Sequence, residues 1–459
     1  MASNEKTSVS ELTENLARYI STGLDQEFPA HVVDKTRAQF LDTLAAMVSG
    51  SLLEPGRLAT DYVRMLGGAE ICTVVGSDFR TNPVNAALAN GMMGHADESD
   101  DSHLGGRFHP GCGIVPAALA VAELISASGR DLLSSITIGY EIGIRFNLSL
   151  GLTKLYAGGH STHSVGTLFG GTAATAALLR HDTTQVRHQL SYSVQQASGV
   201  QCWIRDARHV EKAFDFGGMS ARNAVTAATM IRAGFTGVDD ALSGPNTFYS
   251  AFGENPDPSI LLRGLGSTFE ILGTSIKKWC VGAPAQSVMD ALVYLMAETP
   301  FRAEDIERIE LQLPSDRVSI VDSRPMPAVN VQFLSAVMLL DRGLSFESAH
   351  DEERMKAPEV ADLVSRMTLV GNEELTHALP PRQVIVTLLL KEGRKLSHRT
   401  RAVRGTPDNP MTYDEVVAKA RDLFQQVLPA STADDIIAWV NEMEAHSDVS
   451  ALSRLLRKP

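Results

Sequence analysis

The densest group of polar side chains runs from His95 to His109 and reads HADESDDSHLGGRFH. It combines three histidines with four carboxylates, the side chains that most often move protons near neutral pH. The flanking segments are rich in alanine and helix-like, so this stretch is predicted to be a loop, and loops on a rigid scaffold often carry function. A solvated acidic loop with helix caps is the alternative interpretation.

A metal site is a second alternative for the same stretch. His95, Asp97, Asp101 and His103 are good ligand types, and they would suit a metal-dependent hydrolase. Their spacing matches no metal motif, and the sequence contains no HExxH. We therefore expect no metal.

Two further segments carry basic side chains. His160 and His163 precede a glycine-rich helix start, whose free N–H groups and dipole favour an anion, although the neighbouring serines and threonine could simply be caps. The stretch 205–212 contains Arg208, His209 and Lys212, and is a basic patch in an acidic chain. Its alternative interpretation is a solvated charged face.

A fourth segment, SIKKWCVG at 275–282, contains Lys277 and Lys278 at a proposed domain junction. Clefts often form at such junctions, although a lysine pair is usually at the surface. Nucleophilic catalysis and dinucleotide binding have little support, because the sequence has no GxSxG and no GxGxxG after a strand.

The elements that must position these residues are mostly helices. Residues 8 to about 265 show helical spacing, including 30–49, 116–128 with Gly129 as a stop, 170–179 and 221–233. From 268 onward strands enter, at 309–313 and in a hairpin over 384–403, with helices at 284–297 and 329–341 between them. Thr412 and Glu415 form a capping box for a new helix.

This pattern predicts a mainly α protein with a helical domain built from both chain ends (1–267 and 404–459) and an inserted α+β domain (268–403). The net charge of −13 argues against a nucleic-acid surface. The four cysteines are far apart, the N-terminus is polar, and no apolar run is long enough to span a bilayer. A cytoplasmic protein with no membrane partner is expected.

Taken in order, these segments resemble the MmgE/PrpD family, which includes 2-methylcitrate dehydratase, cis-aconitate decarboxylase and iminodisuccinate epimerase. NAALANGMMGHADESDDSH at 85–103 is similar to the most recognisable family motif. GYEIGIRF, HSTHSVG, EKAFDFGGMSARNA, SIKKW and GTPDNPMT follow in family order over nearly the whole chain. The resemblance implies the same two-domain architecture, a homodimer, and an active site between the domains that needs no cofactor.

Carried over residue by residue, the resemblance implies the catalytic residues Glu98, His109, His163, Lys212 and Lys277. Expected substrate contacts are Ser102, His160, His103, Asp101, Arg208 and Lys278, and the choice between His160 and His163 stays open. Three departures stand out: Glu98 replaces a frequent Asp, Ser102 a frequent Thr, and Phe333 a frequent Tyr. The last change removes a hydroxyl.

The resemblance implies a small di- or tricarboxylate substrate that loses a proton next to a carboxylate. Fixed cations would stabilise the resulting charge, and His109 or His163 would be the general base. Dehydration of a citrate-like acid is the first expectation. Decarboxylation and epimerisation use the same groups, and a non-catalytic binding protein is the remaining alternative.

Overall fold

The computed structural model describes residues 9–458, which form two compact units. The helical unit contains residues 9–96, 101–274 and 423–458, and the sheet unit contains 97–100 and 275–422. The polar residues 1–8 lie outside the described range. The sequence placed the changes of unit at 268 and 404, whereas the chain changes unit at 275 and 423. It also leaves the helical unit for the four residues 97–100, which the sequence did not predict.

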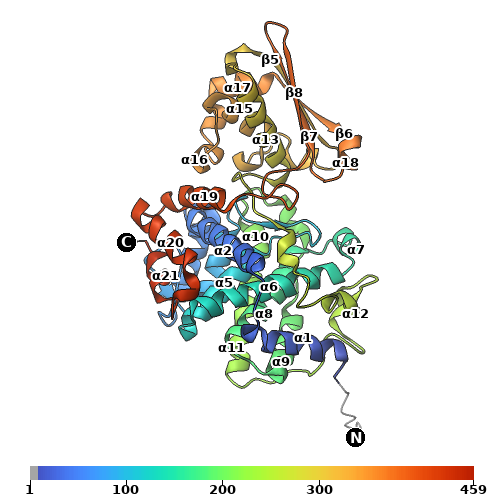
Figure 1. Ribbon diagram of the computed structural model, residues 1–459, viewed down its shortest axis with the longest axis vertical. Coiled ribbons are helices and arrows are strands. Elements are labelled where there is room, and N and C mark those ends of the chain that lie inside the picture. Colours follow the sequence, from blue (N-terminus) through green and yellow to red (C-terminus); the bar gives the residue numbers. More distant parts are fainter. Residues whose placement is uncertain (1–8, 459) are drawn as a thin grey trace. The chain divides into compact units, whose positions relative to one another are not determined.

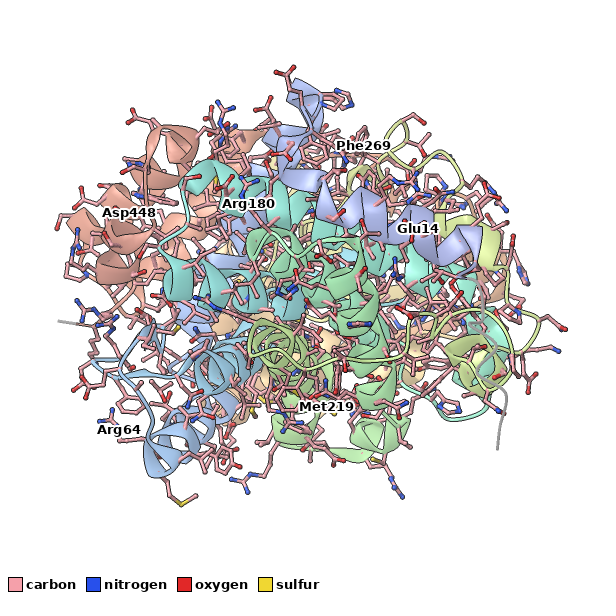
Figure 2. All side chains as sticks on the ribbon, turned by 90° about the horizontal axis from the view of Figure 1, so that it is seen from below. Glu14, Arg64, Arg180, Met219, Phe269 and Asp448 are labelled. Atoms are coloured by element: carbon pink, nitrogen blue, oxygen red, sulfur yellow. The ribbon has the colours of Figure 1, made fainter. Side chains whose placement is uncertain are left out.

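The helical unit consists mainly of helices, with charged side chains such as Glu14, Arg64, Arg180 and Asp448 on its outside (Figures 1 and 2). Its helices are α1 (Glu11–Ser21), α2 (Ala30–Gly50), α3 (Glu54–Leu66), α4 (Pro83–Gly94), α5 (Gly111–Ile125), α6 (Gly129–Ser149), α7 (Leu152–Ala157), α8 (His163–Leu178), α9 (Thr183–Gln196), α10 (Val210–Ala213), α11 (Met219–Arg232), α12 (Phe248–Phe252), α20 (Ala430–Asn441) and α21 (Ser450–Leu455). Strands β1 (Cys72–Thr73) and β2 (Arg80–Thr81) pair antiparallel.

Helices α6 and α8 pack closely at the centre of this unit through glycines. A Cβ at Gly143 would lie 2.4 Å from the carbonyl oxygen of Gly166, and a Cβ at Gly170 would lie 2.6 Å from that of Gly139. Real Cβ atoms do not come so close to a carbonyl oxygen, so only glycine permits this approach. Because α8 begins at His163, the contact also fixes the position of that histidine.

Two helix boundaries differ from the sequence prediction. Pro116 lies inside α5 rather than in its first turn, because the helix already begins at Gly111. Gly129 begins α6 instead of ending the preceding helix, with Ser128 as the N-cap that accepts a hydrogen bond from the N–H of Asp131. Local preference misled the prediction here, because α5 begins with the buried Gly111, Cys112 and Gly113, although glycine is a poor helix former.

The sheet unit is built on a four-stranded sheet in the order β6-β5-β7-β8 (Figure 1). Strand β5 pairs parallel with β6 and antiparallel with β7, and β7 forms the expected hairpin with β8. Its elements are α13 (Ala283–Glu298), β5 (Ile306–Pro314), α14 (Val318–Val321), α15 (Val331–Asp341), α16 (Phe346–Ala349), α17 (Pro358–Ser365), β6 (Met367–Asn372), α18 (Glu373–Thr376), β7 (Val384–Leu390) and β8 (Lys395–Thr400).

Buried and partly exposed side chains alternate along β7, and the buried ones contribute to the hydrophobic core of this unit. The side chains of Val384, Val386, Leu388 and Leu390 are buried, and the residues between them are half-exposed. Helix α13 packs on this hairpin. The chain as a whole is mainly α-helical with a small α+β part, as the sequence predicts. No helix within residues 9–458 is both long and apolar enough to cross a bilayer.

Candidate active site

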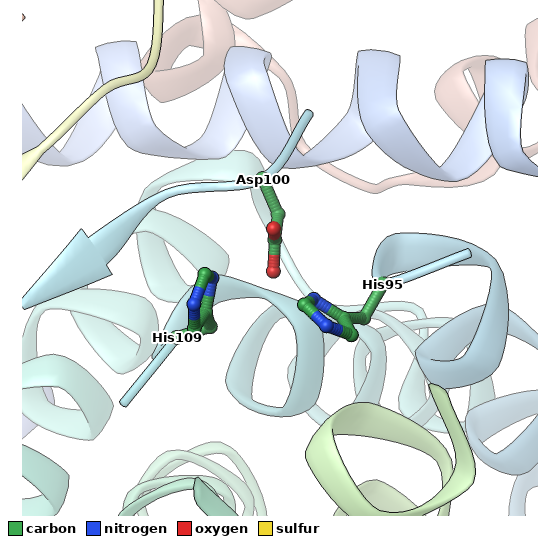
Figure 3. A group of neighbouring side chains, drawn as sticks. All are labelled: His95, Asp100 and His109. Carbon is green, nitrogen blue, oxygen red and sulfur yellow. The ribbon is translucent and has the colours of Figure 1, made fainter. Parts of the chain in front are cut away.

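Three histidines of the helical unit surround the ring of Phe216, and a fourth, His209, lies beside one of them. His163 stacks on this ring with centroids 3.5 Å apart, and His95 stacks on it at 4.2 Å. His109 lies 4.9 Å from His95 and 5.4 Å from His163, again between ring centroids. His209 lies 5.0 Å from His95. Figure 3 shows the rings of His95 and His109; its third labelled side chain, Asp100, belongs to the sheet unit.

The loops that carry His109 and His163 are tied together by hydrogen bonds. The side-chain amide of Asn147 on α6 donates to the carbonyls of Gly106 (2.9 Å) and Thr162 (2.8 Å). The hydroxyl of Thr162 donates to the carbonyl of Arg107 at 2.7 Å. Asn147 thus bridges the segments before His109 and His163, and the Thr162–Arg107 bond joins these two segments directly. The two imidazoles are therefore held in a fixed relation by buried polar groups.

Phe216 lies in a π-helical turn, Phe214–Gly218, between α10 and α11. Such turns are rare and frequently occur at functional sites. Gly217 and Gly91 of α4 approach so closely that a Cβ on Gly217 would lie 2.1 Å from the carbonyl oxygen of Gly91. The turn therefore packs directly on α4, and His95 follows the end of that helix.

Lys212 projects from α10 beside the same aromatic group. Its ammonium lies 5.2 Å from the ring centre of Phe216 and 5.9 Å from that of Trp203. Aromatic faces attract cations at this range. Asp206 accepts the backbone N–H groups of Glu211 (2.6 Å) and Lys212 (3.2 Å), which fixes the start of α10. A cation is thus held next to the imidazoles.

The residue before Phe216 in the π-helical turn is an aspartate, Asp215. Asp215 is buried and accepts a hydrogen bond from the hydroxyl of Ser161, two residues before His163. Burial raises the pKa of Asp215 to about 7, against the opposing effect of the Ser161 hydrogen bond. This pair connects the π-helical turn with the start of α8.

In the sheet unit, Lys277 is buried among the acidic residues of the segment 97–100. Its ammonium donates to the carbonyl of Glu98 at 3.0 Å and forms ion pairs with the carboxylates of Glu98 (3.2 Å) and Asp100 (3.4 Å). Burial alone would lower the pKa of Lys277, but the two carboxylates raise it above its ordinary range. Its positive charge is therefore already balanced within this unit.

Three expected substrate contacts lie in the loop after this segment. Asp101 caps α5, because one carboxylate oxygen accepts the N–H of Gly111 at 2.9 Å and the other accepts the hydroxyl of Tyr140 at 2.7 Å. His103 accepts the N–H of Gly106, and burial lowers its pKa to about 4. The buried hydroxyl of Ser102 has no hydrogen-bond partner among residues 9–458. Of the three, Ser102 is the one whose geometry suits a ligand.

The other three expected contacts, His160, Arg208 and Lys278, lie outside this loop. The imidazole of His160 is 5.8 Å from Phe252, whereas His163 belongs to the histidine group. Arg208 is exposed and forms an ion pair with Glu54. The ammonium of Lys278 lies over the ring of Trp279 at 4.9 Å. Within the helical unit the structure thus brings together His109, His163 and Lys212, and within the sheet unit Glu98 and Lys277.

Three of the four residues proposed for a hydrolytic metal, Asp97, Asp101 and His103, form other hydrogen bonds. Asp101 and His103 accept the backbone and hydroxyl hydrogen bonds described above, and the two carboxylate oxygens of Asp97 accept the N–H (2.8 Å) and hydroxyl (2.6 Å) of Ser99.

Sequence reasoning gave no role to His209, Phe216, Trp203 and Asp215. His209 is buried and has a positive φ of 62°, an unfavourable backbone conformation for a residue other than glycine. The FDFGG sequence at 214–218 was a signal that was available, since paired glycines beside an aromatic residue suggest close packing. Phe333, which replaces the family's frequent tyrosine, is buried in the hydrophobic core of the sheet unit.

Known proteins match this chain along almost its full length. The family model for the MmgE/PrpD N-terminal domain matches residues 14–261, and that for the MmgE/PrpD C-terminal domain matches 279–445. Cis-aconitate decarboxylase of Homo sapiens is 27% identical, with 98% of this chain and 95% of that protein covered. Cis-aconitate decarboxylase of Mus musculus is 26% identical (93% and 90% covered), and that of Aspergillus terreus is 22% identical (100% and 97% covered). The chain belongs to the MmgE/PrpD family.

Proposed function

We propose that this protein is a lyase that removes carbon dioxide from a small tricarboxylate of the cis-aconitate type. The observation that carries the proposal is the group of imidazoles around Phe216 with the ammonium of Lys212 beside it. Relatives named cis-aconitate decarboxylase, covered over at least 90% of their length, support this choice of reaction. It takes precedence over dehydration of a citrate-like acid, which the sequence alone placed first.

The chemistry needs a cation and a proton donor. When a carboxylate leaves as carbon dioxide, its carbon–carbon bond breaks and the electron pair stays on carbon, where the neighbouring unsaturated carboxylate delocalises it. Lys212 stabilises this negative charge, and an imidazolium supplies the proton that carbon takes up. His109 and His163 are the candidates for this proton transfer, because both lie in the imidazole group.

The remaining assignments follow from burial and charge. The unsatisfied hydroxyl of Ser102 suits a hydrogen bond to a substrate carboxylate. Glu98 is held by Lys277, so its carboxylate is positioned for an acid–base role rather than for attracting the anion. Lys277 in turn is assigned to holding Glu98. A homodimeric assembly, a cytoplasmic location and independence of cofactors stay predictions.

The test is to incubate chelator-treated protein with cis-aconitate, citrate and 2-methylcitrate separately in deuterated water. Carbon-13 spectra of the products are then recorded. We expect carbon dioxide release from cis-aconitate and a product that carries one solvent deuterium on carbon. Formation of an unsaturated acid from citrate or 2-methylcitrate, without carbon dioxide, would establish a dehydratase instead. Saturable binding of all three acids without turnover would support the non-catalytic alternative.

A further inference from the structure

Trp203 is the buried residue of a short helical turn in the helical unit, Gln201–Arg205. The residues on either side of it are exposed, whereas Trp203 itself is only 8% exposed. Its indole meets the rings of Phe216 and His163 edge to face, with centroids 4.8 Å and 5.6 Å apart. Trp203 therefore belongs to the group of rings around Phe216.

One residue, Asp206, fixes the backbone of both Trp203 and Lys212. The N–H of Asp206 donates to the carbonyl of Trp203 at 2.9 Å, and the carboxylate of Asp206 accepts the N–H of Lys212 at 3.2 Å. The ammonium of Lys212 lies 5.9 Å from the centre of the indole ring. A cation and an indole are thus held near each other, beside His163.

The indole N–H of Trp203 is buried and has no hydrogen-bond acceptor within the described part of the chain. Indole is a donor that cannot accept, so only an acceptor atom can satisfy it. Leaving a buried donor unpaired is destabilising, and a bound acceptor would relieve that cost. Next to an ammonium, the acceptor that suits both groups is an oxygen of an anion.

The other two tryptophans show what is particular to Trp203. The indole N–H of Trp279, in the sheet unit, donates to the carboxylate of Asp290 at 2.9 Å. The indole N–H of Trp439 is buried without an acceptor among residues 9–458, but its ring stacks on His446, outside the group around Phe216, with centroids 4.7 Å apart. Trp203 is thus the tryptophan that combines an unpaired donor with a neighbouring lysine and the imidazole group.

We infer that Trp203 is a substrate-binding residue, whose indole N–H donates to one carboxylate of a small polycarboxylate while Lys212 pairs with the same carboxylate. An ammonium on a flexible stem supplies charge but little direction, whereas the indole has a single N–H with a fixed direction. Trp203 therefore orients the carboxylate that Lys212 attracts. That this anion is the substrate of the reaction rests on the proposed function, whereas the binding of a carboxylate beside Trp203 does not.

The first experiment requires no turnover. Propane-1,2,3-tricarboxylate is the saturated analogue of aconitate and lacks the double bond that would delocalise the electron pair, so it binds without losing carbon dioxide. Nitrogen-15 spectra of tryptophan-labelled protein show one indole N–H signal for each of the three tryptophans. Trp279→Phe and Trp439→Phe assign two of these signals, and the third is that of Trp203. On titration with the analogue we expect the Trp203 proton to shift downfield, because it gains an anionic acceptor, and the other two signals to stay in place.

The second experiment removes the N–H of Trp203 and keeps an aromatic ring. In Trp203→Phe the Kd of propane-1,2,3-tricarboxylate, measured by calorimetry, should rise about tenfold, because a hydrogen bond to a charged group is lost. The KM for cis-aconitate should rise by a similar factor with kcat within about threefold, since the carboxylate is bound before and during the reaction. The matched control is Trp439→Phe, which removes the other buried, unpaired indole N–H and should leave Kd and KM within about twofold.

The outcomes separate this inference from the proposed function. If neither propane-1,2,3-tricarboxylate nor cis-aconitate moves the Trp203 signal further than that of Trp439, the inference is wrong, whatever the turnover assay shows. A folded Trp203→Phe variant that binds the analogue as tightly as the wild type also overturns it. If the Trp203 signal responds but the wild type releases no carbon dioxide from cis-aconitate, the carboxylate site stands and the proposed function fails.

Discussion

The two lysines expected at the active site have different surroundings in the two units. Lys212 of the helical unit lies beside the aromatic faces of Phe216 and Trp203. Lys277 of the sheet unit is fully buried between the carboxylates of Glu98 and Asp100. The two carboxylates balance the charge of Lys277 and tie its ammonium to the segment 97–100. Lys277 is therefore the better candidate to hold an acid in place, whereas Lys212 lies next to the imidazoles.

The same contrast applies to the groups around the lysines. In the helical unit, imidazoles gather around one phenylalanine ring, and such groups can gain or lose a proton near neutral pH. In the sheet unit, carboxylates and lysines form a network that fixes a short segment of backbone. We infer that the first group performs proton transfer and the second provides rigidity. Each variant below tests one side of this comparison.

The largest effect is expected for His163→Asn. Losing a general acid or base typically lowers turnover by about 10²- to 10⁴-fold. Stability should change little, because His163 is only partly buried. The measurement is kcat with the tricarboxylate of the proposed assay, together with the melting temperature.

The matched control for this variant is His160→Asn, since His160 lies next to Phe252, away from the imidazole group. It should keep kcat within about twofold, in line with ordinary surface substitutions. If His160→Asn were the damaging change and His163→Asn the harmless one, the imidazole group would not be the catalytic centre.

Lys277→Met should mainly reduce stability. Removing one partner of a buried ion pair leaves uncompensated charge and typically costs about 3–5 kcal/mol. Here two carboxylates would lose their counterion. Denaturant unfolding monitored by circular dichroism measures the loss in the free energy of unfolding. The control Lys278→Met alters a neighbouring cation over Trp279 and should cost less than about 1 kcal/mol.

A different result for Lys277→Met would contradict the assignment of Lys277 to holding Glu98 in place. If the variant unfolds like the wild type and its KM rises more than tenfold, Lys277 binds substrate directly. The carboxylates of Glu98 and Asp100 would then be its partners only in the absence of ligand.

Asp215→Asn is expected to remove a pH dependence of stability. The pKa of Asp215 is raised by burial to about 7 in the folded protein, whereas an unfolded aspartate titrates near 3.9. The folded state thus binds the proton more tightly, so this contribution is present below about pH 4 and is lost as pH rises to about 7. One pKa unit corresponds to about 1.4 kcal/mol, which sets an upper limit of about 4 kcal/mol.

Melting temperatures of the wild type and Asp215→Asn at pH 5 and pH 8 test this expectation. Asparagine keeps an acceptor for the Ser161 hydroxyl, so the variant should gain stability relative to the wild type on going to pH 8. If the melting temperatures of the two proteins differed by the same amount at pH 5 and pH 8, Asp215 would be charged at both pH values. The Ser161 hydroxyl would then donate to a carboxylate over this whole range.

The sequence predicted the helices and the hairpin well, because periodic apolar positions determine them locally. Segments 284–297 and 384–390 coincide closely with α13 and β7. The residues of the imidazole group were partly predictable, since His109 and His163 lie in motifs. The environment of Lys277 was not, because its partner Glu98 lies 179 positions away, and Lys419 contacts Ser99 across 320 positions. Charge pairs of this kind arise only from the tertiary fold.

The loop conformations were not predictable from the sequence. Asp101 caps α5 and accepts a hydrogen bond from Tyr140, and its acidic neighbours in the sequence indicate neither contact. His209 adopts a positive φ that its residue type does not favour. Histidines and carboxylates in one stretch of sequence thus separate into structural and chemical roles only when their neighbours in space are known.

The smallest expected effect is that of Phe216→Leu. The ring stacks with His95 and His163 and lies below the ammonium of Lys212, and each such contact is worth about 0.5–1.5 kcal/mol. Leucine keeps the position apolar but lacks the flat face, so kcat should fall about tenfold. Phe214→Leu is the control, because this ring belongs to the same π-helical turn and stacks instead with Arg222. Equal losses in both variants would show that the turn, and not the ring of Phe216, orders the imidazoles.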